Sequence, residues 1–251
     1  MATPRDLTSM LQAWPFVPGS MAARRFKGRD GTEKLQLRVD LGILQMNATG
    51  RPDGKQPLGH PTWLHVIQER LASRSSPARD GVPVLTPDEF ARIHQESIQF
   101  HHRSVCLLQL NDLQGVEADC AHNRGIFDLL HDHAPSREMA WPVLQMLPQQ
   151  TLLLARARVA HLKPSSYDEH LRIIDDSLAV LDEFFQRLER PDWAHVCPEK
   201  IALSQWREQL VANRPMSALE QLGSKLADAI QREDYELAAR LRDQIKKLEQ
   251  G

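Results

Sequence analysis

Cationic side chains that could bind an anion are concentrated near the N-terminus. Residues 21–60 contain eight lysines and arginines but four acidic residues, whereas the whole chain of 251 residues carries a net charge of -2. Clustered guanidinium and ammonium groups bind phosphates and the backbone of nucleic acids. The candidate contacts for an anion or a nucleic acid are Arg24, Arg25, Arg38, Arg51 and Lys55. An ordinary solvated surface is the competing interpretation, because nucleic-acid binding normally requires a denser basic surface.

The glycine- and proline-rich segment 47–61 contains two of these cations. Its sequence, NATGRPDGKQPLGHP, places Arg51, Asp53 and Lys55 on a loop. Loops carry a large share of binding residues, and glycine-rich loops can bring backbone N–H groups close to an anion. We therefore expect this loop to be the main candidate binding site outside the C-terminal tail.

Cysteine and histidine side chains, which bind transition metals, gather around residues 120–133. Cys120 and His122 would point about 200° apart on a helix, so they could not easily share one ion. His131 and His133 fall near a helix C-terminus, where a cation complements the helix dipole. The three cysteines of the chain form no CxxC pair and fit a reducing cytoplasm. We expect no metal site and no cofactor.

The sequence motifs of common catalytic sites are absent from the chain. It has no phosphate-binding GxxxxGKS/T loop, no HExxH helix, no GxGxxG turn and no GxSxG elbow. The sequence therefore predicts a protein that is not an enzyme. Its apolar runs are far shorter than the roughly 20 residues that a membrane-spanning helix needs, so we expect no membrane span.

The elements that would position these residues begin with extended segments. Residues 1–20, which include three prolines, are expected to form an irregular arm. An Asp30-Gly31 turn signal then separates two runs, and alternate residues from Leu35 to Ile43 are apolar. A period of two gives a strand one apolar face. We therefore predict a β-hairpin within residues 21–60 whose apolar face packs on helices.

Helical patterns dominate the chain after residue 61. Thr86 is followed by Pro87 and then by Glu89, the signature of an N-terminal capping box. Helices are expected at residues 62–74, 87–111, 116–133, 141–162, 167–189 and 199–213. The predicted fold class is mainly α, with an antiparallel helical array over residues 61–214. Two helices match at an offset of 55 residues, as in tetratricopeptide-like pairs or in unrelated amphipathic helices.

Two apolar stripes at helical spacing mark residues 216–251. They consist of Leu219, Leu222, Leu226 and Ile230, followed by Ala238, Leu241, Ile245 and Leu248. Between them, Asp234 and Glu236 favour a helix N-terminus through capping and the helix dipole. The pattern predicts a C-terminal αα-hairpin with a charged tip.

The segment from Leu219 to Glu249 resembles the UVR motif, a helical hairpin of the bacterial excision-repair proteins UvrB and UvrC. The matching features are Leu226, Ala229, Asp234-Tyr235-Glu236, Ala238-Ala239, Leu241-Arg242-Asp243, Ile245 and Leu248. In that family the hairpin pairs with a similar hairpin on a partner protein. The resemblance implies partner contacts by Tyr235 and Glu236 at the tip. Further partner-binding candidates are Asp234, Arg242 and Asp243.

The alternative for Tyr235 is that it packs on Leu241 or on the body of the protein. The missing phosphate loop distinguishes the chain from UvrB, and its N-terminal segment resembles that of uncharacterised bacterial proteins with a similar tail. We expect a cytoplasmic bacterial adaptor whose tail binds a partner with a UVR-like or coiled-coil hairpin. An accessory protein of DNA excision repair, which contacts nucleic acid through the basic N-terminal segment, is the alternative.

Overall fold

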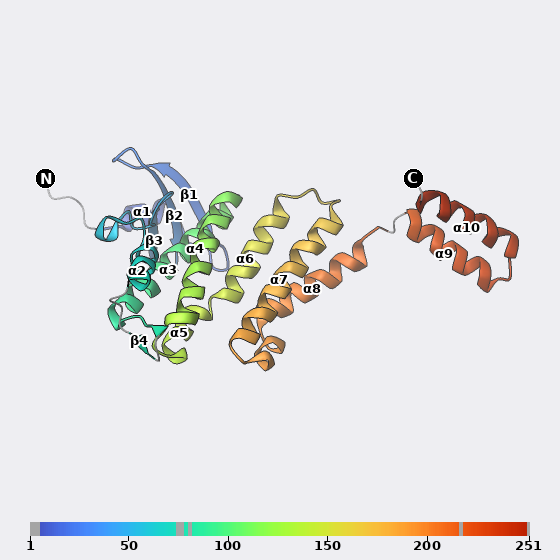
Figure 1. Ribbon diagram of the computed structural model, residues 1–251. Coiled ribbons are helices and arrows are strands. Elements are labelled where there is room, and N and C mark those ends of the chain that lie inside the picture. Colours follow the sequence, from blue (N-terminus) through green and yellow to red (C-terminus); the bar gives the residue numbers. More distant parts are fainter. Residues whose placement is uncertain (1–5, 74–77, 80–81, 216–217, 250–251) are drawn as a thin grey trace. The chain divides into compact units, whose positions relative to one another are not determined.

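The computed structural model describes residues 6–73, 78–79, 82–215 and 218–249. The chain divides into two compact units, Met1–Gln205 and Trp206–Gly251. The first unit combines a small sheet with a helical array, and the second contains the C-terminal hairpin (Figure 1). The predicted fold class, mainly α with an N-terminal β element and a C-terminal αα-hairpin, is confirmed.

Three antiparallel strands in the order β1-β2-β3 form the sheet: Ala22–Lys27, Glu33–Val39 and Gly42–Asn47. The predicted turn at Asp30-Gly31 joins β1 to β2, and Gly31 has a φ of 78°, which glycine adopts without strain. A second tight turn at Asp40-Leu41 was not predicted. It divides the expected long strand into two, because Val39 pairs with Gly42 across it.

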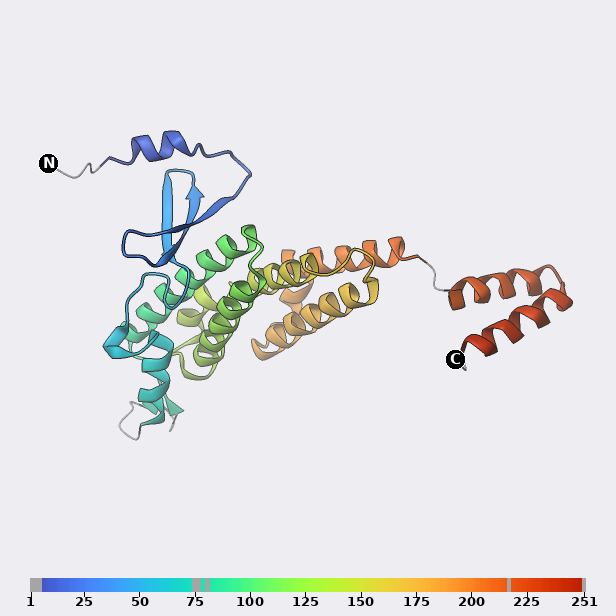
Figure 2. The same ribbon diagram turned by 90° about the horizontal axis from the view of Figure 1, so that it is seen from above.

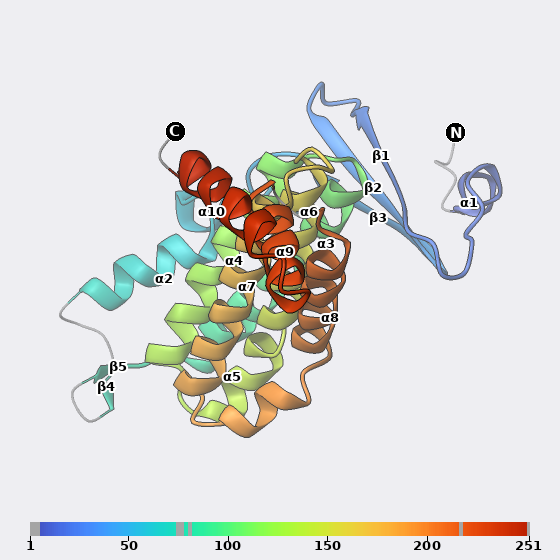
Figure 3. The ribbon, with the colours of Figure 1, turned by 90° about the vertical axis from the view of Figure 1, so that its right-hand side faces the viewer.

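One face of the sheet forms the centre of the main core. Leu35 and Leu37 of β2 are buried against helices α3 (Pro87–Gln109) and α4 (Leu113–His133), with Cys106 and Val116 among their neighbours. The thiol of Cys106 donates a hydrogen bond to the backbone carbonyl of Gln36 at 3.7 Å. Figures 2 and 3 show the sheet at one side of the helical array. The expectation that the apolar face packs on helices is therefore confirmed.

The helices of the described chain keep most of the predicted positions. Their bounds are α1 Thr8–Ala13, α2 Trp63–Ala72, α3 Pro87–Gln109, α4 Leu113–His133, α5 Arg137–Leu144, α6 Leu147–Ala160, α7 Tyr167–Arg187, α8 Pro198–Asn213, α9 Ala218–Gln231 and α10 Tyr235–Glu249, with 3-10 turns η1 at Pro57–Gly59 and η2 at Pro191–His195. Two short strands, β4 at Ala78–Arg79 and β5 at Val82–Pro83, pair in antiparallel orientation between α2 and α3.

Local chemistry explains where several helices begin. Thr86 accepts a hydrogen bond from the backbone N–H of Glu89, and the Glu89 carboxylate accepts from that of Thr86, so the predicted capping box is present. The helix expected over residues 141–162 is instead divided into α5 and α6. Pro148 lies in the first turn of α6, where the missing N–H of proline costs nothing and favours a new helix start.

The long helices pack in sequence order. Helix α3 packs on α4, α4 on α6 and α6 on α7, so that α6 lies between α4 and α7 (Figure 1). The array supplies the surface on which the sheet and the loop after it are held. Among the described residues, none of the helices combines the length and apolar character needed to cross a membrane. The tetratricopeptide-like pairing stays a prediction.

A matched pair of leucines tests the strand register. Leu35 is 0% exposed and Leu41, in the second turn, is 90% exposed. We expect Leu35→Ala to lower the free energy of unfolding by about 2–5 kcal/mol, as buried leucines do. Leu41→Ala should change it by less than about 0.5 kcal/mol. Urea titration followed by circular dichroism measures both, and a similar cost for the two substitutions would contradict the turn at residues 40–41.

Candidate functional site

The loop expected to be a binding site, residues 47–61, is held by side chains of the helical array. Arg103 of α3 donates to the backbone carbonyls of Asn47 and Gly50 at 3.2 and 2.6 Å. The same guanidinium makes two hydrogen bonds with the Asp119 carboxylate of α4, at 2.9 and 2.6 Å. One buried ion pair thus fixes the start of the loop to two helices.

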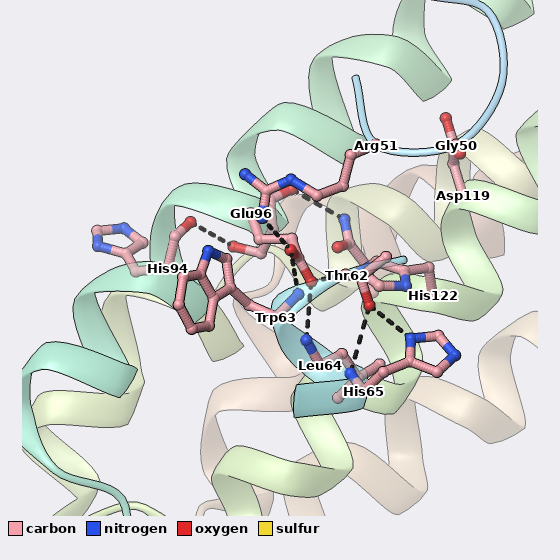
Figure 4. A network of polar contacts seen from close by, with 12 residues as sticks. Gly50, Arg51, Thr62, Trp63, Leu64, His65, His94, Glu96, Asp119 and His122 are labelled. Atoms are coloured by element: carbon pink, nitrogen blue, oxygen red, sulfur yellow. Dashed lines mark hydrogen bonds and ion pairs between the residues drawn. The ribbon is translucent and has the colours of Figure 1, made fainter. Parts of the chain in front are cut away.

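Arg51 points from this loop into the protein. Its Nε and Nη2 atoms donate to the two carboxylate oxygens of Asp53 at 2.9 and 2.7 Å, and its Nη1 donates to Glu96 at 2.6 Å. The side chain of Arg51 is 4% exposed and that of Glu96 is 0% exposed. Figure 4 shows Arg51 and Glu96 directed toward each other. A guanidinium that is buried and paired in this way has a structural role.

Glu96 joins four parts of the first unit. Besides Arg51, its carboxylate accepts from the backbone N–H groups of Trp63 and Leu64, at 2.8 and 3.1 Å, and contacts His122 Nε2 at 3.1 Å (Figure 4). Trp63 and Leu64 are the first residues of α2, where unpaired N–H groups and the helix dipole attract a negative charge. Glu96 therefore binds the start of α2 to α3, α4 and the loop.

The ionisation of this cluster follows from its contacts. Burial acts to raise the pKa of Glu96, but the hydrogen bonds from His122, Trp63 and Leu64 together outweigh it and leave the pKa below the usual range. Burial also opposes ionisation of Asp53, yet the Arg51 guanidinium and the Lys55 backbone N–H hold its pKa at about 2. Both carboxylates are thus ionised at neutral pH and depend on their partners.

Two of the five predicted anion contacts must therefore be corrected. Arg51 is buried, and its guanidinium is already paired with Asp53 and Glu96. Arg38 is also buried, and its guanidinium donates to backbone carbonyls of Trp14, Asp40 and Gly42 at 2.7, 3.0 and 3.0 Å. It fastens the N-terminal arm and the second turn to the sheet. Local sequence could not show the contacts of Arg38 with Trp14 or of Arg51 with Glu96, because these partners lie 24 and 45 residues apart in the chain.

The other three predicted cations remain at the surface. Arg25 forms ion pairs with Glu33 of β2 and with Asp112, the N-cap residue of α4. Arg24 lies on the face of the sheet opposite the core, and its guanidinium stacks on the Trp14 ring at 4.3 Å from the centroid. Lys55 is exposed in the loop. These side chains are distributed over different surfaces and do not form one site.

The cysteine and histidine side chains around residues 120–133 are also separated. Cys120 is buried, and burial raises the pKa of its thiol to about 12. His122 contacts Glu96, while His131 contacts Asp132 at 2.7 Å. In the part of the chain that the structure describes, no group of three or more histidine, cysteine, aspartate or glutamate residues could hold a metal ion.

The second unit contains the predicted C-terminal hairpin. Ala229, Ala238 and Leu241 form the buried contact between α9 and α10, and Leu222 and Leu226 pack beside them. The small side chains of Ala229 and Ala238 allow the two helices to approach closely. The predicted stripes are therefore confirmed in part, whereas the side chains of Leu219 and Leu248 lie outside the described residues.

The tip of the hairpin is a tight helix-helix connection. The backbone N–H groups of Asp234 and Glu233 donate to the carbonyls of Ala229 and Ile230, at 2.9 and 3.0 Å, which is the Schellman pattern of a helix C-terminus. Glu233 takes the left-handed position, with a φ of 59°. Asp234 then caps α10 by accepting from the Leu237 N–H at 3.0 Å. Asp234 thus shapes the tip, as the sequence indicated.

Apolar side chains at this tip are left uncovered within the hairpin. Tyr235 is 70% exposed, Ile230 54% and Leu237 43%. Tyr235 is therefore not packed on Leu241 within the hairpin. The alternative in which it packs on the body of the protein stays a prediction. Sequence reasoning missed Leu237 and placed Ile230 in the apolar stripe facing α10.

The other predicted partner contacts lie along one side of α10. Tyr235 and Arg242 are seven residues apart, which places them on one face of the helix about 10 Å apart along its axis. Glu236 and Asp243 share the adjacent face in the same way. Arg242 pairs with Asp243 at 3.9 Å, and both are more than half exposed. The structure thus brings these predicted residues onto two neighbouring faces of one helix.

Comparison with known proteins identifies the hairpin. A family model described as the UvrB/uvrC motif matches residues 217–251. The C-terminal hairpin is therefore a UVR motif, and residues 1–216 lie outside the match. No curated protein and no solved structure matches the chain.

Removal of Arg51 tests its structural role. Arg51→Ala would leave two carboxylates without their cation, one of them fully buried, so we expect the free energy of unfolding to fall by about 3–5 kcal/mol. The matched control is Arg137→Ala, because Arg137 pairs with Glu189 at 2.9 Å at an exposed surface. The control should cost far less than Arg51→Ala, because solvent screens this exposed ion pair. Equal costs, measured by urea titration, would contradict the structural assignment of Arg51.

The depressed pKa of Asp53 predicts a pH dependence with a definite sign. A carboxyl whose pKa is lower in the folded state contributes stability above its unfolded-state pKa and loses it as the pH falls through the folded value. The contribution should therefore disappear between about pH 4 and about pH 2. Asp53→Asn should make the free energy of unfolding fall less steeply over this pH range than it does in the wild type. Parallel curves for the wild type and Asp53→Asn would refute the linkage.

Proposed function

We propose that this protein is a non-enzymatic adaptor that binds a partner protein through its C-terminal UVR motif. The observation that carries the proposal is the exposed apolar surface at the hairpin tip, formed by Ile230, Tyr235 and Leu237. A soluble surface rarely leaves several large apolar side chains uncovered at one point unless they contact something. The tip is therefore the surface where we place the partner.

The size of the hairpin supports the same conclusion. Its buried interior consists of Ala229, Ala238 and Leu241, with Leu222 and Leu226 at the edge. A two-helix unit of this size buries too little apolar surface to be very stable by itself. Packing against a second helical hairpin or a coiled-coil segment would complete a four-helix arrangement and cover the exposed side chains. The proposed partner carries such a segment.

The charges around the tip indicate what would recognise it. Glu233, Asp234 and Glu236 surround Tyr235, and Arg242 lies two turns away on the same helix face as Tyr235. Tyrosine and arginine are the side chains that most often dominate the affinity of protein interfaces. We therefore expect a partner surface with an apolar pocket for Tyr235, cations opposite the acidic tip and an acid opposite Arg242.

The presence of a UVR motif does not by itself assign excision repair, since the match covers residues 217–251 alone. A bacterial source and a cytoplasmic location stay predictions from the sequence. The adaptor role requires no catalytic step.

Substitution of Tyr235 tests the proposal. The tagged full chain would be used to capture proteins from a lysate of its native host, and each captured partner would be purified for titration. We expect Tyr235→Ala to weaken direct partner binding by about tenfold or more, as loss of an interface tyrosine does. The fold should be unaffected, because the side chain is 70% exposed.

Gln244→Ala is the matched control for this experiment. Gln244 lies nine residues after Tyr235, on the opposite side of α10, and is also exposed. It should bind the partner as the wild type does. Deletion of residues 216–251 should abolish binding. If every captured protein binds the deletion variant and Tyr235→Ala as tightly as the wild type, the hairpin is not the docking element.

A further inference from the structure

The β1-β2-β3 sheet has a second face that contributes nothing to the main core. The strand register places Arg24, Gln36 and Gln45 in one row on this outer face, and Phe26, Lys34 and Asn47 in the next row. Helix α1 lies beyond this face, on the side away from the helical array (Figures 2 and 3). The outer face therefore belongs to neither the helical core nor the C-terminal hairpin.

A hollow of about 750 Å³ opens on this outer face. Met10 of α1 borders it, and Arg24, Phe26, Arg29, Lys34 and Gln45 line it. Its volume is within the range of small-ligand sites, about 300–1,000 Å³. The lining combines an aromatic ring with three cations, whereas its one carboxylate is that of Asp30.

The charge of the hollow is positive. Lys34 pairs with Asp30 at 2.8 Å, so these two charges largely compensate each other. Arg24 and Arg29 supply the remaining positive charge. Arg29 is exposed, and neither arginine has an ion pair with any residue that the structure describes. An anionic ligand would therefore find two uncompensated guanidinium groups at this face.

A hydrogen-bonded ladder fixes one of these guanidinium groups in place. Arg24 Nε donates to Gln36 Oε1 at 2.7 Å, and Gln36 Nε2 donates to Gln45 Oε1 at 2.8 Å. The Trp14 ring packs against the plane of Arg24, 4.3 Å from its centroid. Among the described residues, the Nη atoms of Arg24 have no hydrogen-bond partner, so they can donate to a ligand from a preorganised position.

We propose that the outer face of the β1-β2-β3 sheet binds single-stranded nucleic acid. Arg24 and Arg29 would contact the phosphates, and a base would stack on Phe26. Binding of single strands combines a cationic surface with aromatic rings, because every base has a stacking face that a duplex keeps inside. The proposal involves neither Arg38 nor Arg51, and it does not depend on the UVR motif.

Titration of a labelled oligonucleotide tests this inference. The full chain would be added to a fluorescein-labelled oligodeoxythymidylate of about 15 nucleotides, in about 50 mM salt, with anisotropy as the readout. We expect binding that weakens steeply as salt increases. Phe26→Ala removes the proposed stacking contact and Arg29→Ala removes a proposed phosphate contact. Each substitution should weaken oligonucleotide binding by about fivefold or more. Circular dichroism would check that both variants fold.

Two control variants test whether binding belongs to the outer face of the sheet. Arg172→Ala removes an equal charge from α7, where Arg172 is 70% exposed, and should leave binding unchanged. Tyr235→Ala should also leave oligonucleotide binding unchanged. The nucleic-acid proposal and the partner-binding proposal are therefore tested separately. The inference is overturned if the oligonucleotide does not bind, if Arg172→Ala weakens binding as much as Arg29→Ala, or if duplex DNA or polyglutamate binds equally well.

Discussion

The buried carboxylate of Glu96 is the contact on which the first unit depends. It accepts hydrogen bonds from Arg51, from the first two N–H groups of α2 and from His122, so it connects the loop after the sheet to three helices. A charge with no solvent contact is tolerated only when its partners replace the lost hydration. The neighbouring pair Arg103–Asp119 fixes the same loop by its backbone. The two ion pairs, Arg51–Glu96 and Arg103–Asp119, therefore fix the position of this loop relative to the helical array.

Burial of some of its cations limits which residues of the basic N-terminal segment can contact a ligand. Cations that look equivalent along the chain divide into those that hold the fold, Arg38 and Arg51, and those that face solvent, including Arg24 and Arg29. The buried ones set the geometry from which the exposed ones project. A ligand surface on the sheet therefore rests on a core whose charges are already paired, so that binding would not require those pairs to break.

The two units offer surfaces of different chemistry. The hairpin tip combines exposed apolar side chains with acids, as suits contact with another protein, whereas the outer face of the sheet combines cations with an aromatic ring. Because each surface is made by residues of one unit, each can be altered without changing the other. A protein with both surfaces could hold a partner protein close to a nucleic acid, and the effective concentration set by the chain between them would then govern the coupling.

Local chemistry was sufficient to determine several features. The Asp30-Gly31 turn and the capping box at Thr86 follow from residues within a few positions of one another, and the C-terminal hairpin follows from two apolar stripes at helical spacing, so the sequence alone predicted all three. The turn at Asp40-Leu41 was hidden, because the apolar alternation continues through it into β3. The roles of Arg51 and Glu96 depended on tertiary structure, since they lie 45 residues apart and meet only when α2, α3 and the loop assemble. Whether a charged or apolar side chain is free to bind is decided by burial, and burial is a property of the packed elements rather than of the local sequence.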